Sequence, residues 1–444
     1  MTAAPTCVAR ARIETDAGEF VGYSSDLLVP KWFDKDPAKS LDQDARDLVE
    51  SARLASAAFA TDGQDTVFAH WWRVYRERVH GVPSEARDRL VRGFGVALCE
   101  RAIMDAVCRA ANLGFHAALK ADLFGFRPGE ALPALEGWRL ADSLPAAPLT
   151  AIDVRHTIGL ADALRRADAQ DDPQDGLPIA LEEDIRRYGF THFKIKLNGD
   201  REHDLARLAQ IADVLAAEGV TAPRVTVDGN EQYEDLGQLV SVFEEAARAE
   251  PVRALLDGLL YVEQPIARAH SFDPERTAAM STLDKWAPTV IDEADTGLDS
   301  FPRALELGYA GVSVKNCKGV FRALLNRGLC ERHGSNAFQC SEDLTNLPVL
   351  ALQQDLATLA SLGLTHTERN GHHYFRGLEL LPAAERESAL GAHADLYSQG
   401  EHGTDLRIKN GRLEFGSIHG PGYGYASEID VEARTPSAEW EARA

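Results

Sequence analysis

Two lysines stand two positions apart at the end of a short β-branched and aromatic run, Thr191-His192-Phe193-Lys194-Ile195-Lys196. Side chains two apart on a strand point to the same side, so Lys194 and Lys196 would emerge together. Each ammonium disfavours the charge of the other, which lowers a lysine's pKa and can make it a base near neutral pH. Taken alone, the pair also fits an ordinary solvent-exposed strand end.

Four further apolar runs stop at a charged residue: Val225-Thr226-Val227-Asp228, Tyr261-Val262-Glu263, Val290-Ile291-Asp292 and Val312-Ser313-Val314-Lys315. If each terminal charge points inward, the apolar residue before it points outward, as packing against helices requires. One acid at a strand end is usually a helix cap or a surface residue. Three carboxylates on consecutive strands, with lysines before and after them, instead predict a site for a hard divalent cation such as Mg²⁺.

The elements that would position these charges follow from residue 149 onward, where short apolar runs alternate with amphipathic helical patterns. This alternation is typical of βα units and a parallel sheet. Eight strands fit a TIM-type barrel, in which the carboxyl ends of the strands form the catalytic rim. A doubly wound open sheet is the alternative, but no G-x-G-x-x-G follows the first strand. We expect strands at 149–154, 191–196, 224–228, 258–263, 288–292, 311–315, 336–340 and 362–367.

Three regions are predicted from these patterns. Residues 1–145 form an α+β domain with a hairpin over 8–24, a helix over 42–60 and a later long helix, for which Ser84 is a candidate cap. Residues 146–385 form the barrel. Residues 386–444 form a tail with a hairpin at Asn410-Gly411. We expect this tail to return to the first domain.

Composition narrows the class of protein. The 444 residues carry 47 basic and 69 acidic side chains, a net charge of −22, which argues against nucleic acid and anionic membranes as partners. The six cysteines form no C-x-x-C pair and are interpreted as reduced thiols. Neither an apolar signal core nor a run long enough to span a bilayer is evident. We therefore expect a soluble, cytoplasmic protein that acts on a small molecule.

Lys194-Ile195-Lys196, Asp228 with Asn230, Glu263-Gln264-Pro265, Asp292-Glu293 and Lys315 together resemble the enolase superfamily. The likeness is to its muconate lactonizing enzyme and mandelate racemase branch, and to the muconate lactonizing subgroup with a lysine on each face. Less specific likenesses are Glu100 to Ala106, similar to the family's last N-terminal helix, and Gly420 to Gly424, similar to its C-terminal return.

The resemblance implies a modified (β/α)7β barrel with an α+β capping domain made from the N-terminal region and the C-terminal tail. It implies one Mg²⁺ ion held by Asp228, Glu263 and Asp292. Lys196 and Lys315 would face each other across the substrate's α-carbon, and Lys194 would tune Lys196 or touch the substrate carboxylate. A homo-oligomer is also expected.

Some residues depart from the family pattern or remain open. The seventh strand has no histidine, so the His-Asp pairing of the mandelate racemase subgroup is not expected. Lys318 competes with Lys315 for the second catalytic position, and strand parity favours Lys315. The pair His372-His373 is interpreted as an exposed loop. Candidates for contact with the substrate or with the metal ligands are Asn230, Glu293, Glu342, Trp32 and Phe33.

The expected reaction is Mg²⁺-dependent abstraction of the proton α to a carboxylate, through an enediolate. Lysines on both faces favour racemisation or epimerisation. Cycloisomerisation and elimination by a dehydratase or lyase are the alternatives from the same chemistry. A metal-binding homologue without catalysis and a metal-assisted hydrolase are the rival classes, and the lysine pair argues against both.

Overall fold

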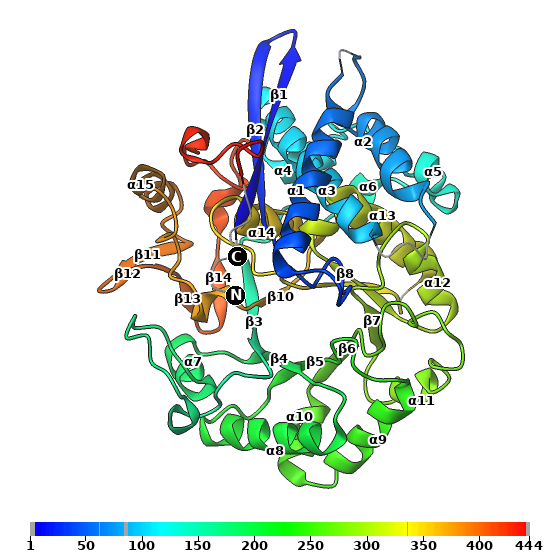
Figure 1. The fold of residues 1–444 in the computed structure, drawn as a ribbon, viewed down its shortest axis with the longest axis vertical. Coiled ribbons are helices and arrows are strands. Elements are labelled where there is room, and N and C mark those ends of the chain that lie inside the picture. The colour runs from blue at the N-terminus through cyan, green and yellow to red at the C-terminus, as the bar shows by residue number, and fades with distance from the viewer. Residues whose placement is uncertain (1–4, 62, 84–87, 335, 441–444) are drawn as a thin grey trace.

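The computed structural model describes residues 5–61, 63–83, 88–334 and 336–440 (Figure 1). The chain opens with the antiparallel hairpin of β1 (Thr6–Thr15) and β2 (Gly18–Leu27), so the predicted hairpin is confirmed with longer strands. Helix α1 (Leu41–Phe59) confirms the helix expected over 42–60, and the Ser40 side chain caps it by accepting from the Gln43 N–H. Ser84 lies outside the described residues.

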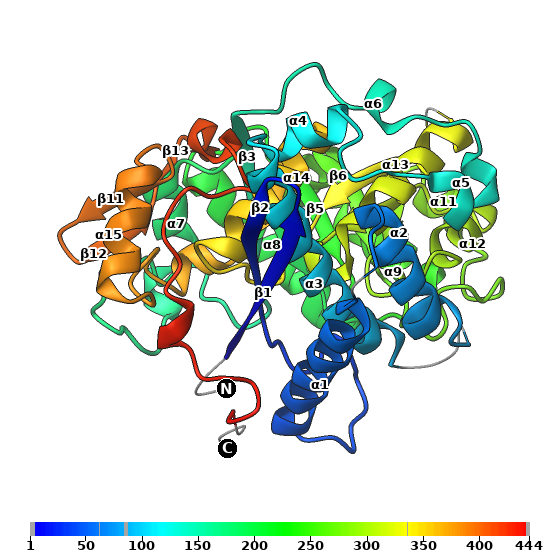
Figure 2. The same ribbon diagram turned by 90° about the horizontal axis from the view of Figure 1, so that it is seen from above.

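Helix α3 (Arg89–Ala110) is the centre of this first region, and most of its residues are buried. Helix α2 (Val67–Tyr75) and helix α1 pack against it, and the hairpin lies along it (Figure 2). Gly22 of β2 permits this approach, because a Cβ there would lie 2.2 Å from the Ala106 nitrogen. Short helices then lead to the barrel: α4 (Phe115–Lys120), α5 (Pro128–Ala131) and α6 (Leu140–Ser143).

Eight strands form the barrel, and each pairs in parallel with the next from the first to the seventh. The eighth strand pairs in parallel with the first, and its Thr367 hydroxyl lies 2.7 Å from that of Ser341 on the seventh. First and last strands are therefore neighbours, which an open doubly wound sheet would not allow. The strands are β3 (Ala151–Ile158), β4 (His192–Lys196), β5 (Arg224–Asp228), β6 (Leu259–Glu263), β7 (Thr289–Ile291), β8 (Gly311–Val314), β9 (Phe338–Ser341) and β10 (His366–Arg369).

All eight strands expected from the sequence are present, although the first and last begin two and four residues later than predicted. Helices cover the outside of the ring (Figure 1). They pack on the apolar residues at alternate strand positions, which are buried, such as Val225, Val227 and Val312. The helices are α7 (Leu181–Tyr188), α8 (Arg201–Ala217), α9 (Leu236–Ala246), α10 (Glu250–Asp257), α11 (Met280–Leu283), α12 (Ser300–Glu306), α13 (Val320–His333) and α14 (Leu350–Leu362).

The tail contains α15 (Ala383–Ala392), the small sheet of β11 (Tyr397–Gly400) and β12 (Gly403–Leu406), and the hairpin of β13 (Ile408–Lys409) and β14 (Arg412–Glu414). Asn410 and Gly411 both have positive φ at the hairpin turn, as predicted. Strand β14 pairs with β3, so this hairpin extends the barrel sheet instead of joining the first domain.

The glycine-rich segment that follows does reach the first region. Asp105 of α3 accepts hydrogen bonds from the Tyr423 N–H at 2.8 Å and the Tyr425 hydroxyl at 2.6 Å. It also accepts from the Tyr23 N–H of β2 at 3.0 Å. One buried carboxylate therefore joins the hairpin, α3 and the tail. Within the described residues, no helix is both long and apolar enough to cross a membrane.

Glu100 on the same helix joins the first region to the barrel. Its carboxylate accepts from the backbone N–H groups of Val320 and Phe321, at the start of α13. Burial raises the pKa of Glu100 to about 8, against an ordinary value of 4.5. Between these two pH values the folded protein holds a proton that the unfolded chain releases, so stability falls as pH rises from about 5 to 8.

We expect Glu100→Gln to remove this pH dependence, because glutamine stays neutral and keeps an acceptor for the Val320 N–H. The variant should be more stable than the parent at pH 8, by up to about 1.4 kcal/mol for each pH unit above the ordinary pKa. Urea unfolding at pH 5, 6, 7 and 8 measures the difference. Glu244→Gln, at an exposed position of α9, is the control. Equal pH slopes for parent and Glu100→Gln would contradict the assignment.

Candidate active site

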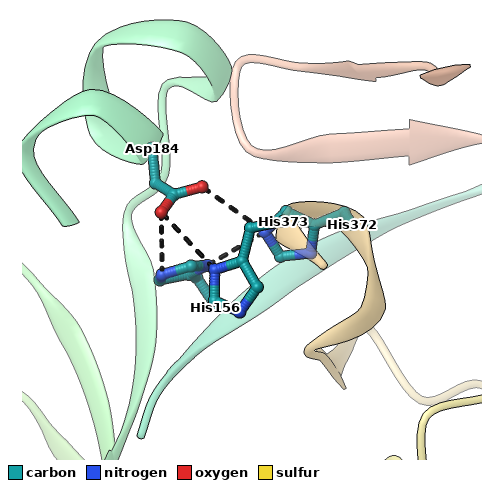
Figure 3. A group of neighbouring side chains, drawn as sticks. All are labelled: His156, Asp184, His372 and His373. Carbon is teal, nitrogen blue, oxygen red and sulfur yellow. Dashed lines mark hydrogen bonds and ion pairs between the residues drawn. The ribbon is translucent and has the colours of Figure 1, made fainter. Parts of the chain in front are cut away.

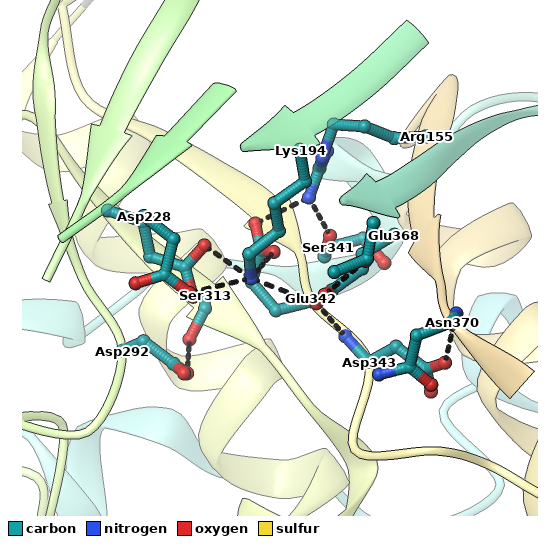
Figure 4. Close-up of polar contacts among 12 residues, drawn as sticks. Arg155, Lys194, Asp228, Asp292, Ser313, Ser341, Glu342, Asp343, Glu368 and Asn370 are labelled. Carbon is teal, nitrogen blue, oxygen red and sulfur yellow. Dashed lines mark hydrogen bonds and ion pairs between the residues drawn. The ribbon is translucent and has the colours of Figure 1, made fainter. Parts of the chain in front are cut away.

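The predicted charged residues lie at the carboxyl ends of consecutive barrel strands, and Figure 4 shows Lys194, Asp228 and Asp292 among them. Asp228 ends β5 and Glu263 ends β6, and the two are direct partners in the sheet register. Asp292 follows β7 by one residue, and Lys315 follows β8. Lys196 ends β4 opposite Asp228 in the register. Strands β4 and β8 are four apart in a ring of eight, so Lys196 and Lys315 stand on opposite sides of the mouth.

Lys194 lies at the centre of the site, with a side chain only 1 % exposed. Its ammonium is 2.7 Å from Glu263, 2.8 Å from Glu342, 3.0 Å from Glu368 and 3.1 Å from Asp228. Burial disfavours its charge, but the attraction of these carboxylates outweighs burial and raises the pKa of Lys194 well above its ordinary value. Lys194 is therefore a fixed positive charge that gathers four acids from four strand ends.

Lys196 forms an ion pair with Asp228, and 24 % of its side chain is exposed. It is more accessible than Lys194 or Lys315, whose side chains are 1 % and 5 % exposed. Burial and the neighbouring Lys194 lower its pKa, but Asp228 more than offsets them, so the pKa of Lys196 is raised. The sequence-based expectation of a lowered pKa is wrong, because it left out the carboxylate of Asp228 beside the pair.

Asp292 is held by Lys315, at 2.6 Å, and by the Ser313 hydroxyl. Burial alone would raise the pKa of Asp292. The nearby lysines Lys315 and Lys318 instead hold this pKa well below its usual range. In this structure the oxygens of Asp228 and Glu263 converge on Lys194, whereas Asp292 turns toward Lys315. The structure therefore brings two of the three predicted ligands to one point and places the third beside a lysine.

Lys318 reaches the same region from the turn after β8, which strand parity did not anticipate. Its ammonium lies 2.7 Å from the Ser313 hydroxyl, 3.1 Å from Asp295 and 3.2 Å from the Asp292 carbonyl oxygen. Lys315 instead has one carboxylate partner and the Trp32 ring, whose centroid is 4.7 Å from its ammonium. Lys318 is thus enclosed by structural acceptors, and Lys315 is the better placed of the two to face a substrate.

Glu263 provides the test of whether the residues fit a cation. Within the described parts of the chain, both of its carboxylate oxygens are buried without a hydrogen-bond donor, since Lys194 approaches at 2.7 Å outside hydrogen-bond geometry. Burial, Asp228 and Glu342 raise the pKa of Glu263 well above its ordinary value. Buried oxygens without donors, beside further carboxylates, suit a hard divalent cation such as Mg²⁺.

Of the remaining predicted residues, some contact the charged group of the site and one lies in the core of the first region. Glu342 accepts from the Tyr261 hydroxyl at 2.6 Å and meets Arg155 at 2.7 Å, so it belongs to the charged group. Burial, together with Asp292 and Glu231, raises the pKa of Glu293 to about 7, and one of its oxygens is buried without a hydrogen-bond partner.

Asn230 has a positive φ and donates its backbone N–H to Asp228 at 2.7 Å, which orients that carboxylate. Trp32 of the loop after β2 lies over Lys315. Phe33 points elsewhere: it is 2 % exposed and packs edge-on against Phe94 of α3, with ring centroids 5.2 Å apart. Phe33 therefore belongs to the core of the first region and not to the wall of the site.

Sequence reasoning missed Glu368 of β10 and Arg155 of β3. Glu368 accepts from Lys194 at 3.0 Å and from the Thr157 hydroxyl at 2.7 Å. The last strand was expected to end at residue 367, one position before Glu368, and this weak strand signal hid the residue. Arg155 lies within its strand and not at the strand's end, so the search of strand ends did not reach it.

Comparisons with known proteins place this fold. The family described as enolase C-terminal domain-like matches residues 179–431. The muconate lactonizing enzyme from Klebsiella pneumoniae superposes with a TM-score of 0.57 and 16 % identity, over 96 % of this chain and 92 % of that one. A dipeptide epimerase from Enterococcus faecalis gives 0.59 and 16 %, over 94 % and 98 %.

The muconate lactonizing enzyme from Pseudomonas putida gives a TM-score of 0.59 and 15 % identity, over 96 % of this chain and 92 % of that one. A sequence comparison with curated proteins finds no match. The family match covers more than half of the 444 residues, and the fold agrees with it along nearly the whole chain. The chain belongs to the enolase superfamily, in the branch of the muconate lactonizing enzymes and mandelate racemases.

Proposed function

We propose that this protein catalyses divalent-cation-dependent removal of the proton α to a substrate carboxylate, with racemisation or epimerisation as the outcome. The observation that carries the proposal is the order of charges around the rim: a lysine, three carboxylates on consecutive strands, then a lysine on the opposite side. A proton α to a carboxylate is very weakly acidic, because its removal adds a second negative charge. A cation held by the three protein carboxylates can compensate that added negative charge.

In this proposal Asp228, Glu263 and Asp292 hold one Mg²⁺ ion. The chemistry such an ion supplies is positive charge beside the substrate's carboxylate oxygens, where negative charge grows as the α-proton leaves. Asp292 would have to exchange its contact with Lys315 for the cation. Without Asp292, the Lys315 ammonium would keep its contact with the Trp32 ring and be available to a substrate.

Lys196 is the proposed base on one face, because it is more accessible than Lys194, Lys315 and Lys318. Lys315 is the proposed proton donor on the other face, and the two roles reverse for the opposite enantiomer. Lys194 is a positioning residue: its charge holds Glu342 and Glu368 beside the ligands. Asn230 orients Asp228 through its backbone N–H. Glu293 adds a further carboxyl group close to Asp292 and Asp228.

Residues 1–145 are proposed to cap the barrel of residues 146–385, together with the part of the tail 386–444 that follows the hairpin of β13 and β14, since that hairpin extends the barrel sheet. The contact of Trp32 with Lys315 supports this division, since it brings the first region to the mouth. Trp32 would supply an apolar wall near the substrate. Cycloisomerisation remains the second candidate, because structural relatives include enzymes named muconate lactonizing enzyme. Cycloisomerisation would use the same arrangement of charged residues. It differs from racemisation in the bonds that form and break in the following step.

The test is α-hydrogen exchange in D₂O, followed by NMR over a panel of N-acyl amino acids, dipeptides, hydroxy acids and unsaturated diacids. We expect Mg²⁺-dependent exchange with one class of acid, and no exchange after chelation. Appearance of the opposite stereoisomer supports racemisation, whereas appearance of a lactone supports cycloisomerisation. Exchange that continues unchanged in EDTA would contradict the proposed metal role.

A further inference from the structure

A second group of ionisable side chains lies on the outer side of the barrel wall, away from the lysines. His156 is on β3 and points outward, because its neighbour Thr157 points inward and donates to Glu368. Asp184 is on α7, which covers this part of the barrel. His372 and His373 belong to a single 3₁₀ turn, Gly371–His373, directly after β10. Figure 3 shows the three imidazoles gathered around the Asp184 carboxylate.

The distances are close to those of a four-ligand metal site, although somewhat longer. One ligand atom from each residue lies within 4.8 Å of all the others. Asp184 Oδ2 is 3.6 Å from His156 Nε2 and 3.5 Å from His373 Nδ1, and Asp184 Oδ1 is 4.0 Å from His372 Nε2. Ligand atoms about 2.0–2.1 Å from a tetrahedral Zn²⁺ ion lie about 3.4 Å from one another.

The group is buried and its hydrogen bonding is incomplete. Side chains of His156, Asp184 and His372 are 1–3 % exposed, and that of His373 is 6 % exposed. His156 Nδ1 and His372 Nε2 share a hydrogen bond of 2.9 Å. Asp184 Oδ1, His372 Nδ1 and His373 Nε2 have no hydrogen-bond partner among the residues that the structure describes. If the group were only a hydrogen-bonded cluster in the core, the contact between His156 and His372 would be explained. The three buried atoms without partners would not be explained.

Charge gives an independent reason to expect a cation. In the described part of the chain, the ion-pair contacts of Asp184 are to these histidines alone, and no lysine or arginine reaches it. A buried carboxylate without a lysine or arginine partner favours a nearby positive charge, which a metal ion supplies.

We propose that His156, Asp184, His372 and His373 bind one Zn²⁺ ion, at a site separate from the carboxylates of the barrel mouth. Imidazole ligands favour Zn²⁺ over Mg²⁺, and four protein ligands leave no open position, which is typical of a structural site. The ion would join β3, α7 and the turn after β10. The exposed Tyr374, next to the turn, donates to Asp162 in the loop after β3 at 2.9 Å, so this turn and that loop are also joined outside the site.

Co²⁺ substitution tests the proposal independently of the catalytic one. The full chain, without a histidine tag, is stripped with a chelator and titrated with Co²⁺ while the visible spectrum is recorded. We expect one Co²⁺ per chain with the intense bands of tetrahedral coordination, displaced by one equivalent of Zn²⁺. An oxygen-ligand site at the barrel mouth gives only the weak bands of octahedral coordination. Zn²⁺ should also raise the thermal unfolding midpoint of the stripped protein.

Matched variants locate the ion. Asp184→Asn and His373→Gln should weaken Zn²⁺ binding by more than the about 10- to 100-fold that loss of an outer-shell partner costs. His203→Gln, at an exposed histidine of α8, and Glu263→Gln, at the barrel mouth, should keep the tetrahedral spectrum. A stripped parent protein that gives no tetrahedral spectrum overturns the proposal, whatever the variants do. So does an Asp184→Asn protein that binds Zn²⁺ as tightly as the parent.

Discussion

Lys196→Ala and Lys315→Ala are each expected to lower the rate of racemisation by about 10²- to 10⁴-fold, the usual contribution of one general acid–base group. The two lysines stand four strands apart around the ring, with the three carboxylates between them. A substrate bound at the carboxylates would therefore present opposite faces of its α-carbon to them. Each variant should lose proton removal from one enantiomer and keep exchange of the other in D₂O.

The two single variants should therefore each keep hydrogen exchange of a different enantiomer. NMR measurement of deuterium incorporation, starting from each enantiomer separately, distinguishes them. Lys409→Ala, at an exposed position of β13, is the matched lysine control and should behave as the parent. If both variants lose exchange of the same enantiomer, the opposed-lysine arrangement is wrong. If Lys318→Ala rather than Lys315→Ala gives the second pattern, the assignment moves to Lys318.

Lys194→Met is expected to have the largest effect on stability. The ammonium lies within 3.1 Å of four buried carboxylates, and its loss would leave them without that compensation. Removing one partner of a buried charge pair costs about 3–5 kcal/mol. The midpoint of urea unfolding measures the loss, with Lys409→Met as the control.

Mg²⁺ should stabilise the Lys194→Met protein more than it stabilises the parent. The reason is that a divalent cation restores positive charge among the same carboxylates, and binding to the folded state alone adds to stability. Equal stabilisation of the two proteins by Mg²⁺ would show that Lys194 and the cation do not act on one set of acids.

The strand ends and their charges could be predicted because they depend on short-range patterns. Alternation along β5 and β8 requires Asp228 and Lys315 to follow outward-facing valines, and parallel strands bring their carboxyl ends to one edge. The hairpin turn at Asn410-Gly411 is equally local. The order of the strands along the barrel could be predicted from these local sequence patterns.

What the sequence could not supply depends on side-chain conformation and on distant segments. Lys318 reaches Asp292 because the turn after β8 folds back. Phe33 was assigned to the site on its type, but Phe94 of a helix some sixty residues later holds it in the core. The pKa of Lys196 rises because the attraction of Asp228 outweighs burial and the repulsion of Lys194. His372 and His373 were assigned to an exposed loop, although His156 and Asp184 bury them.

Titration with Mn²⁺, followed by electron paramagnetic resonance and calorimetry, tests the central claim most directly. Mn²⁺ accepts the same oxygen ligands as Mg²⁺. We predict one Mn²⁺ per chain, competed by Mg²⁺, retained in Lys196→Ala and in Asp184→Asn, and lost in Glu263→Gln. Glutamine preserves the shape of the side chain but removes the charge of the carboxylate whose oxygens lack hydrogen-bond donors. Binding of Mn²⁺ to Glu263→Gln with the parent's affinity would contradict the proposed metal site and the reaction built on it.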